Sequence, residues 1–301
     1  FAIVVLGYSA VRFGLFPKPG VGGLIAFVNN FATPCLLFRA MYAVDFAETF
    51  QPTTMLPFYF GALVCGALGI VSARVLFSRR PGEAVASGFS AFFANTVLVG
   101  IPVIERAYGQ PAMTVTFAII SVHAAILFTT GMIAMEIARR DGAPMGTTLL
   151  RAGRAMVANP ILWGVFLGLL GNVSGFEMPT LVDATTALIA LAIVPVALFG
   201  LGGALTEYRI VESWPEAAVV STIKLMVHPA ITWVLMVPVL GVQHDIAKVV
   251  VLLAAMPSGI NTYIFATYYN RNTGVAANAV LISTVAGFVT ISFWLWVLTP
   301  G

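Results

Sequence analysis

The chain has 301 residues, of which 59% are hydrophobic and 9% are charged, whereas about a quarter of the residues of an average soluble domain are charged. This composition excludes a soluble α/β protein, which needs amphipathic helices with charged faces, and runs such as AKVVVLLAAM (247–256) lack the alternation of a β-barrel. The net charge of +3 does not indicate nucleic-acid binding, because the basic residues lie at the ends of apolar segments.

Apolar runs of about 20 residues are long enough to cross a bilayer as helices. They recur along the whole chain and predict an all-α polytopic membrane protein with ten transmembrane helices. These helices are expected near 1–15, 21–42, 54–77, 84–104, 111–138, 154–171, 179–204, 214–240, 246–268 and 276–298. The first run looks too short to span alone, so further residues are expected upstream of Phe1.

The basic residues predict the orientation of these helices. Eleven of the 15 Lys and Arg residues lie in the odd-numbered loops and three lie in the even-numbered loops. Because cytoplasmic loops carry an excess of Lys and Arg, we expect the odd loops in the cytoplasm and both termini outside. The predicted location is the cytoplasmic (inner) membrane of a bacterium.

Weak internal similarity divides the chain into halves. PCLLF (34–38) matches PVALF (195–199) at an offset of 161 residues, and the same offset pairs Gly7 with Gly168 and Tyr108 with Tyr269. Because each half has an odd number of helices, homologous halves must cross the membrane in opposite senses, as in many secondary transporters. We therefore predict two inverted repeats, 1–138 and 154–301, joined by a cytoplasmic linker at 139–153.

Two of the predicted helices contain helix breakers at matching places in the two halves, ANTVLVGIPV (94–103) and MPSGINTYIF (256–265). A proline lacks an N–H and clashes with the carbonyl four residues earlier, and freed backbone groups in hydrocarbon are costly unless they line a cavity. Proline merely kinks many membrane helices, but paired interruptions are typical of a transporter binding site. The predicted breaks lie at Gly100, Pro102, Pro257 and Gly259.

At such a break the amino ends of half-helices present N–H donors and partial positive charge, which suit a carboxylate. Asparagine side chains add further donors. The sequence therefore predicts an anion site in the two interrupted segments. Its expected members are Asn95, Thr96, Pro102, Pro257, Ser258, Gly259, Asn261 and Thr262.

The interrupted segments resemble the crossover segments of the auxin efflux carrier family, which includes plant PIN-FORMED carriers and bacterial malonate and malate permeases. The resemblance is carried by ANTVLVGIPVIERAYG (94–109) and AAMPSGINTYIFATYYN (254–270). It extends through NNFATPCLLF (29–38), PVALFGLGGAL (195–205) and STIKLMVHPAI (221–231). The chain departs from the plant carriers in lacking their long loop between the halves and in having Asn261 where they tend to be apolar.

This resemblance implies an architecture like that of bile acid:sodium symporters. A scaffold domain would comprise helices 1, 2, 6 and 7, and a transport domain would comprise helices 3 to 5 and 8 to 10. Helices 4 and 9 would cross at their prolines, and Asn95 would meet a substrate carboxylate there. Elevator-type movement of the transport domain would alternate access, and a homodimer would form through the scaffold domain.

Other polar residues lie within the predicted helices. Lys224 is about ten residues into helix 8, where an ionisable group is costly and by default indicates function, so it is expected to attract an organic anion or to exchange a proton. Alternatively, its stem snorkels to a headgroup or its ammonium binds a carbonyl freed by Pro229. His123 and His228 are weaker candidates for proton coupling, and Asn30 is a candidate substrate contact from the scaffold.

The sequence thus predicts a secondary transporter of a small mono- or dicarboxylate, either malonate- or malate-like or auxin-like, and not an enzyme. No cofactor or metal site is predicted, and the coupling ion, H⁺ or Na⁺, stays open because the crossing has no Asp or Glu. One alternative is a receptor or sensor on the same fold that has lost transport. An intramembrane enzyme is a further alternative, but the aspartates lie near segment ends and no G-x-S-x-G motif is present.

Overall fold

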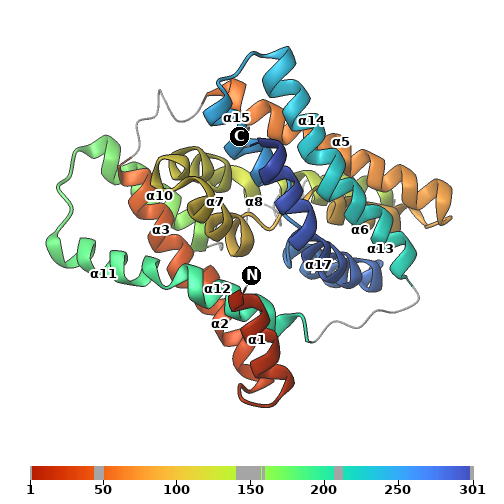
Figure 1. Ribbon diagram of the computed structural model, residues 1–301, viewed down its shortest axis with the longest axis horizontal. Helices are drawn as coiled ribbons and strands as arrows, with labels where there is room; N and C mark the ends of the chain where they lie inside the picture. The colour runs from red at the N-terminus through yellow and green to blue at the C-terminus, as the bar shows by residue number, and fades with distance from the viewer. Residues whose placement is uncertain (1, 44–50, 140–156, 158–159, 207–212, 299–301) are drawn as a thin grey trace. The chain divides into compact units, whose positions relative to one another are not determined.

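The computed structural model describes residues 2–43, 51–139, 157, 160–206 and 213–298 (Figure 1). Within these ranges the regular structure is helical, apart from one antiparallel bridge between Ala94 and Ser258. The predicted all-α class is therefore confirmed for the described chain. Most of the predicted linker, 139–153, lies outside the described residues.

Six helical stretches of the described chain are long and apolar enough to cross a membrane: Lys18–Tyr42, Pro52–Leu76, Gln110–Ala138, Thr180–Ala204, Trp214–Val239 and Thr273–Leu298. Large apolar side chains such as Phe60, Val289 and Trp296 are exposed on them, as lipid contact requires and water would oppose. The other predicted helices correspond to shorter or interrupted helices, so ten membrane crossings remain a prediction.

The chain forms two compact units, each assembled from separate parts of the sequence. The first unit comprises 1–49, 97–123 and 153–207, and the second comprises 50–96, 124–152 and 208–301. The first contains α1 (Ala2–Arg12), α2 (Lys18–Phe27), η1 (Val28–Ala32), α3 (Thr33–Tyr42), α7 (Ile101–Tyr108), η3 (Gln110–Ala112), α10 (Pro160–Ser174), α11 (Thr180–Leu191) and α12 (Ile193–Ala204). The second contains α5 (Pro52–Leu76), α6 (Pro81–Phe92), α13 (Trp214–Thr222), η4 (Ile223–Val227), α14 (His228–Val234), η5 (Leu235–Val239), α15 (His244–Ala254), α16 (Asn261–Tyr268) and α17 (Thr273–Leu298). Both η2 (Thr96–Gly100) and α8 (Met113–Arg139) continue from one unit into the other.

Glycines set the helix packing of the first unit. A Cβ at Gly7 of α1 would lie 2.2 Å from the carbonyl oxygen of Phe199 in α12, and a Cβ at Gly168 of α10 would lie 2.4 Å from that of Phe38 in α3. No side chain fits at either distance, so these glycines let α1 and α12, and likewise α3 and α10, approach closely. Figure 1 shows both pairs side by side.

These two contacts are equivalent under the offset found in the sequence. Adding 161 to Gly7 gives Gly168, and adding 161 to Phe38 gives Phe199. The glycine of each half therefore contacts the phenylalanine carbonyl of the other half. The neighbouring contacts follow the same exchange, because α2 packs on α12 while α11 packs on α3.

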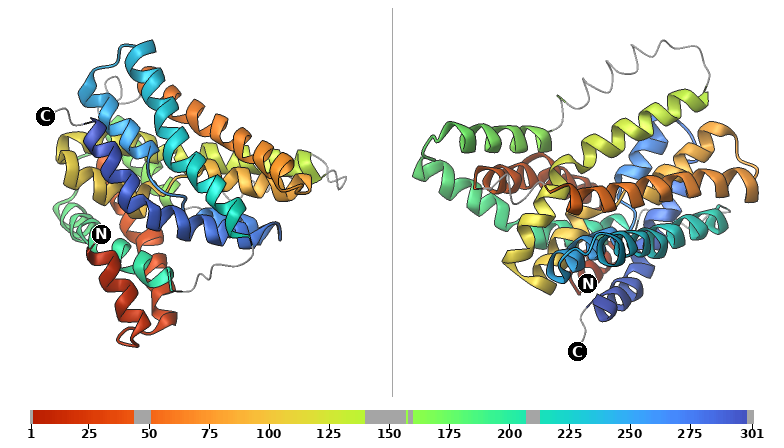
Figure 2. Two further views of the ribbon diagram at one scale, coloured as in Figure 1. Left: turned by 45° about the vertical axis from the view of Figure 1, so that its right-hand side comes forward. Right: turned by 90° about the horizontal axis from the view of Figure 1, so that it is seen from above.

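The second unit packs its helices with equal closeness. In Figure 2, α5 lies beside α6 and α13 lies beside α17. A Cβ at Gly69 of α5 would lie 2.9 Å from the Cα of Gly88 in α6, so this pair brings the two backbones together. Beneath them, Phe89 of α6 stacks on Phe265 of α16 with ring centroids 3.9 Å apart and planes 2° from parallel.

Wide π-helical turns accompany four prolines of the described chain. The turns η1, η2 and η4 end two residues before Pro34, Pro102 and Pro229, and η5 contains Pro238. A proline ring presses on the carbonyl four residues earlier, and a π-helical turn relieves that clash by widening the backbone. At Pro34, Pro102 and Pro229 the helical structure therefore continues beyond the proline.

Candidate functional site

The two interrupted segments cross and hydrogen-bond to each other through their backbones. Helix α6 ends at Phe92 and α15 ends at Ala254. Beyond these ends, Asn95 N–H donates to the Pro257 carbonyl at 2.7 Å and Gly259 N–H donates to the Phe93 carbonyl at 2.9 Å. These bonds form the bridge between Ala94 and Ser258. Each interruption thus satisfies backbone groups of the other, which would be costly to leave unpaired in hydrocarbon.

Side chains and a glycine hold this crossing in place. Ser258 is buried, its hydroxyl donates to the Ser90 carbonyl at 2.8 Å, and its N–H donates to Ser283 Oγ at 3.0 Å. A Cβ at Gly259 would lie 3.2 Å from Phe93 Cδ1 and 3.4 Å from the Ala94 carbonyl oxygen. Position 259 therefore has little space for a larger residue.

The remaining predicted members of the second unit surround this bridge. Asn95 and Thr96 are buried, with 5% and 3% of their surface exposed. Asn261 is the first residue of α16 and is half-buried. The buried Thr262 hydroxyl donates to the Gly259 carbonyl at 2.8 Å. The structure thus brings Asn95, Pro257, Ser258, Gly259 and Thr262 to one place, and two of these side chains, those of Ser258 and Thr262, bond to backbone carbonyls.

Pro102 does not mark the helix break that the sequence predicts there. The interruption of the first segment lies at 93–95, and Pro102 occupies the first turn of α7, just after the π-helical turn η2. In that position the missing N–H and the ring are tolerated. The expectation that Pro102 itself opens the backbone is therefore wrong. Pro102 and Gly100 belong to the first unit.

In the second segment the break is where the sequence predicts it. Pro257 and Gly259 lie in the stretch between α15 and α16, which are separated by 255–260. Met256 N–H still bonds to the Leu253 carbonyl at 3.3 Å, so one tight turn follows the end of α15 at Ala254 before the backbone leaves the helix. Helix α16 then starts anew at Asn261, with its amino end toward the crossing.

Lys224 contacts the end of α15, where that helix runs into the crossing. Its side chain is fully buried, and Nζ donates to the carbonyl of Ala254 at 2.6 Å. A helix leaves its last carbonyls without intrahelical donors and carries partial negative charge there. In a continuous helix the Ala254 carbonyl would accept from Ser258 N–H, but that N–H bonds to Ser283 Oγ. Lys224 therefore supplies the donor that the Ala254 carbonyl lacks within the helix.

The expected snorkelling of Lys224 and its expected bond to a carbonyl freed by Pro229 are both wrong. The carbonyl four residues before Pro229 is that of Leu225, and the indole Nε1 of Trp294 donates to it at 3.0 Å. Instead, Lys224 Nζ lies 3.1 Å from Nδ1 of His228, one helical turn further along. His228 is also fully buried, and its Nε2 lies 3.0 Å from the carbonyl oxygen of Phe58.

Two further predicted residues belong to the first unit. His123 is buried in α8, with 3% of its surface exposed. Asn30 is exposed and lies in the π-helical turn η1.

The sequence matches the family described as "Membrane transport protein" over residues 1–295. The chain belongs to this family, the auxin efflux carriers. A Rhizobium meliloti relative named "Putative malonate transporter" is 25% identical over 305 residues, which cover 100% of this chain and 94% of the relative. "Auxin efflux carrier component 5" of Arabidopsis thaliana is 22% identical, with 93% of this chain and 89% of the relative covered. The mouse "Lysosomal cholesterol signaling protein" is 25% identical over 99% of this chain and 36% of its own length.

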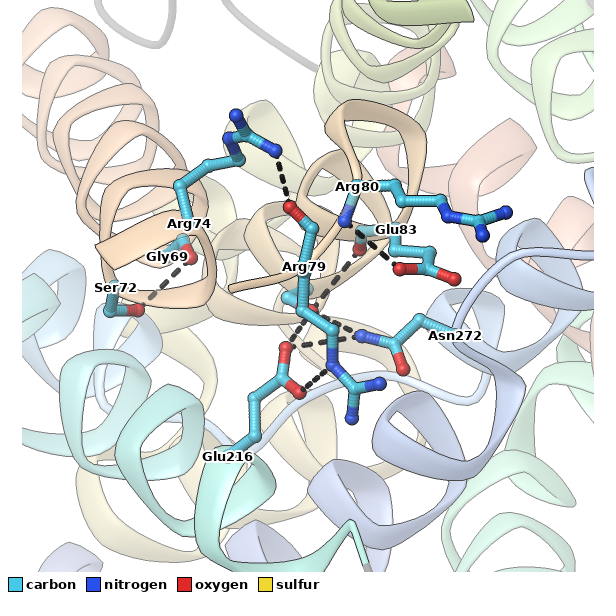
Figure 3. Close-up of polar contacts among 9 residues, drawn as sticks. Gly69, Ser72, Arg74, Arg79, Arg80, Glu83, Glu216 and Asn272 are labelled. Atoms are coloured by element: carbon cyan, nitrogen blue, oxygen red, sulfur yellow. Dashed lines mark hydrogen bonds and ion pairs between the residues drawn. The ribbon is translucent and has the colours of Figure 1, made fainter. Parts of the chain in front are cut away.

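This auxin efflux carrier family member also contains a polar cluster around a buried carboxylate, which the sequence does not predict (Figure 3). Glu216, in the first turn of α13, is 1% exposed. Its Oε2 accepts from Nε of Arg79 at 2.7 Å, and its Oε1 accepts from the Ser87 hydroxyl at 2.7 Å and from Nδ2 of Asn272 at 3.1 Å. Asn272 Nδ2 also donates to Ser87 Oγ at 2.8 Å. We call Glu216, Arg79, Ser87 and Asn272 the Glu216 cluster.

The Glu216 cluster links α6, before the first interruption, to the stretch that follows α16, beyond the second interruption. Ser87 lies on α6, which leads into the crossing, and Asn272 follows α16, which leads out of it. Ser78, near Arg79, and Asn272 adopt left-handed backbone, with φ of 52° and 50°, a conformation unfavourable for most residues other than glycine. Asparagine adopts this conformation more readily than most residues, and Asn272 is held there by its bonds to Glu216 and Ser87.

Among the residues that the structure describes, no three His, Cys, Asp or Glu side chains gather as a metal site would require. The polar groups at the crossing are amides, hydroxyls and backbone N–H groups, which suit hydrogen bonding to an oxyanion.

Proposed function

We propose that this chain is a secondary transporter that carries a small organic anion across the cytoplasmic membrane of a bacterium. The observation that carries this proposal is the crossing of two interrupted segments, Phe93–Asn95 and 255–260, through mutual backbone bonds. Crossed, broken helices from two halves of a membrane protein are typical of transporter binding sites. The family match over 1–295 supports the same class of protein.

The chemistry of the crossing favours a carboxylate as the substrate group. Helix α16 begins at Asn261, and the amino end of a helix offers N–H donors and partial positive charge. Asn95 and Asn261 each carry an amide group with N–H donors. A mono- or dicarboxylate of malonate, malate or auxin type matches this donor set, and the names of the Rhizobium meliloti and Arabidopsis thaliana relatives support that choice.

Alternating access would follow from an inverted repeat of five helices in each half. The exchanged contacts of Gly7 with Phe199 and of Gly168 with Phe38 support such a repeat, because a pseudo-two-fold axis would exchange them in this way. With ten crossings and an excess of basic residues in the odd loops, both termini lie outside. The proposed architecture is that of bile acid:sodium symporters.

An elevator-type movement would carry the crossing from one side of the membrane to the other. The division into two units supports a scaffold of helices 1, 2, 6 and 7, since these belong to the first unit. Most of helices 3 to 5 and 8 to 10 belongs to the second unit, although 97–123 groups with the scaffold helices. The scaffold is also the proposed surface for a homodimer.

A receptor without transport activity is a second candidate function. It is favoured by the similarity to the mouse lysosomal cholesterol signaling protein, in which this chain corresponds to 36% of the length. A receptor of this kind would bind its ligand at the crossing and move nothing across the membrane.

A binding screen tests the proposal. Purified protein in detergent is heated with acetate, malonate, malate or indole-3-acetate, and we expect one of these to raise the unfolding temperature of the wild type. Asn95→Ala should lower the affinity for that carboxylate about tenfold or more, because a hydrogen bond to a charged group contributes about 1.5–3 kcal/mol. Asn172→Ala is the matched control, since Asn172 lies in the first unit, where it bonds to the Tyr42 carbonyl. Equal affinity of Asn95→Ala and wild type would remove the crossing from the site.

A further inference from the structure

We propose that Lys224 and His228 form one proton-binding site, which takes up a single proton together with the carboxylate bound at the crossing. This inference rests on the proposed function and assigns its coupling ion as H⁺. The two side chains lie 3.1 Å apart, both are fully buried, and Lys224 also bonds to the last residue of the half-helix that enters the crossing.

The hydrogen bonds fix which nitrogen of His228 carries the proton. The Phe58 carbonyl can only accept a hydrogen bond, so Nε2, 3.0 Å away, must be the donor. In the neutral ring Nδ1 then has a lone pair. Nδ1 therefore accepts from Lys224 Nζ, and this assignment follows from the bonding network.

This geometry allows the pair to hold one proton beyond its neutral state, and no second one. With Lys224 as an ammonium, Nζ donates to the Ala254 carbonyl and to Nδ1 of His228. If the proton lies on Nδ1 instead, the ring donates to the amine and the amine still donates to Ala254. With both groups charged, two donors would face each other at hydrogen-bond distance in a buried site, where like charges repel strongly.

Among the residues that the structure describes, the charged and titratable groups on the elements packed around the pair do not supply a permanent counter-charge. Cys65 of α5 carries a thiol, which has no charge when protonated and donates at 3.9 Å to the carbonyl of Ile223, the residue before Lys224. Helix α17 contains no titratable residue. The other charged and titratable groups on the packed elements contact residues outside the pair. The two glutamates are Glu216 of α13, which pairs with Arg79, and Glu83 of α6, which accepts from the Arg80 N–H. In α5, Arg74 donates to the Arg79 carbonyl and Tyr59 makes an edge contact with Phe58, and in α15, Asp245 pairs with Lys248 and His244 contacts the Leu298 carbonyl.

A buried ammonium with no carboxylate opposite it is costly. The partial negative charge at the end of α15 offsets only part of that cost. An anion at the adjoining crossing adds the missing negative charge, so carboxylate binding favours the protonated pair. By linkage, the proton strengthens anion binding by the same factor. With the proton, which comes from water, a monocarboxylate would then cross as a neutral load, and a dicarboxylate would cross with one net negative charge.

The test measures protons and anions in the same titration. The carboxylate that stabilises the wild type most among acetate, malonate, malate and indole-3-acetate is added to detergent-purified protein in weakly buffered solution. The pH is kept where the carboxylate is fully ionised, and a pH-indicator dye follows proton uptake. We expect about one proton taken up per anion bound, with an affinity that rises as the pH falls, up to about tenfold per pH unit.

Two glutamine variants separate proton binding from folding. Lys224→Gln carries no basic nitrogen at position 224, and an amide N–H donated to Nδ1 of His228 favours the neutral ring, so the variant should bind the anion with much less proton uptake and with an affinity that depends only weakly on pH. Lys248→Gln is the matched control, because Lys248 lies at the start of α15 in a surface pair with Asp245. It should behave as the wild type does.

Three outcomes would overturn the inference. Anion binding by the wild type without proton uptake, including binding that needs sodium, contradicts the proton site and leaves the proposed function standing. Proton uptake by Lys224→Gln equal to that of the wild type removes Lys224 from the site. If none of the four carboxylates binds the wild type, the proposed function fails and this inference fails with it.

Discussion

The helical segment Trp214–Val239 carries two buried charged side chains, Glu216 and Lys224, which are compensated in different ways. The Glu216 carboxylate faces the guanidinium of Arg79, together with a hydroxyl and an amide. The Lys224 ammonium faces a carbonyl and an imidazole, neither of which carries a full negative charge. Glu216 therefore has a permanent ionic partner, whereas we propose that the counter-charge of Lys224 is the bound substrate anion.

Glu216 and Lys224 also differ in which part of the second unit they contact. The Glu216 cluster joins α6, through Ser87, to Asn272 in the stretch between α16 and α17. Lys224 bonds to Ala254, where α15 meets the crossing. The compensated charge of Glu216 thus stabilises the helices around the crossing. The incompletely compensated charge of Lys224, next to the crossing, can respond to a bound ligand.

The largest change in stability is expected for Glu216→Gln. The new amide keeps one carbonyl oxygen, so it turns its N–H donors either toward Arg79 or, with that oxygen on Arg79, toward the Asn272 amide, which also donates. In both orientations the guanidinium loses its negatively charged partner. Removing one partner of a fully buried ion pair costs about 3–5 kcal/mol. Because the Arg79 side chain is 31% exposed, we expect about 2 kcal/mol here, measured as a lower unfolding temperature in detergent.

The control for Glu216→Gln is the same exchange at Glu105, whose carboxylate accepts from Gln110 at the surface. Glu105→Gln should leave the unfolding temperature nearly unchanged. Unfolding of Glu216→Gln at the wild-type temperature would show that the Glu216 cluster does not stabilise the second unit.

A smaller effect of opposite sign is expected for Lys224→Gln in the absence of ligand. Replacing a buried charge by a neutral group that keeps its hydrogen bonds is often neutral or stabilising. The unfolding temperature should therefore be equal to that of the wild type or slightly higher. A loss of stability as large as that of Glu216→Gln would mean that Lys224 is a structural charge of the same kind, and the contrast would fail.

The smallest effect is expected for Asp245→Asn, which removes an exposed ion pair. Lys248 donates to Asp245 at 2.5 Å and lowers the pKa of that carboxyl. A lowered pKa contributes stability above the ordinary pKa of aspartate, and this contribution is lost as the pH falls through the lowered value. Solvent and salt screen so exposed a pair, so wild type and Asp245→Asn should unfold together at pH 7. A clear difference between the unfolding temperatures of wild type and Asp245→Asn at pH 7 would indicate a role of Asp245 that the geometry does not show.

Much of the crossing could be predicted from the sequence, because helix breakers in apolar segments are visible locally. Pro257 and Gly259 lie in the second break as expected. The first break lies at 93–95 and not at Pro102, because a π-helical turn absorbs that proline. Sequence alone does not show whether a wide turn or a break will relieve a proline clash, since tertiary contacts decide between them.

The Glu216 cluster could not be predicted in the same way. Glu216 stands at the start of an apolar segment, where a carboxylate is usually solvated, and its partners Arg79, Ser87 and Asn272 are distant in the sequence. The one local signal is that Glu216 is the sole acidic residue of 214–240. Lys224 was identifiable because an ionisable group deep in an apolar run is costly, although its partners Ala254 and His228 follow only from the fold.

The central claim is that the crossing binds an organic anion and carries it across the membrane. Uptake of the radiolabelled carboxylate that binds the wild type most tightly, measured in proteoliposomes, tests it most directly. We predict time-dependent uptake by the wild type and by Asn172→Ala, and uptake reduced about tenfold or more in Asn95→Ala. Binding without uptake by the wild type, or wild-type uptake by Asn95→Ala, would contradict the account.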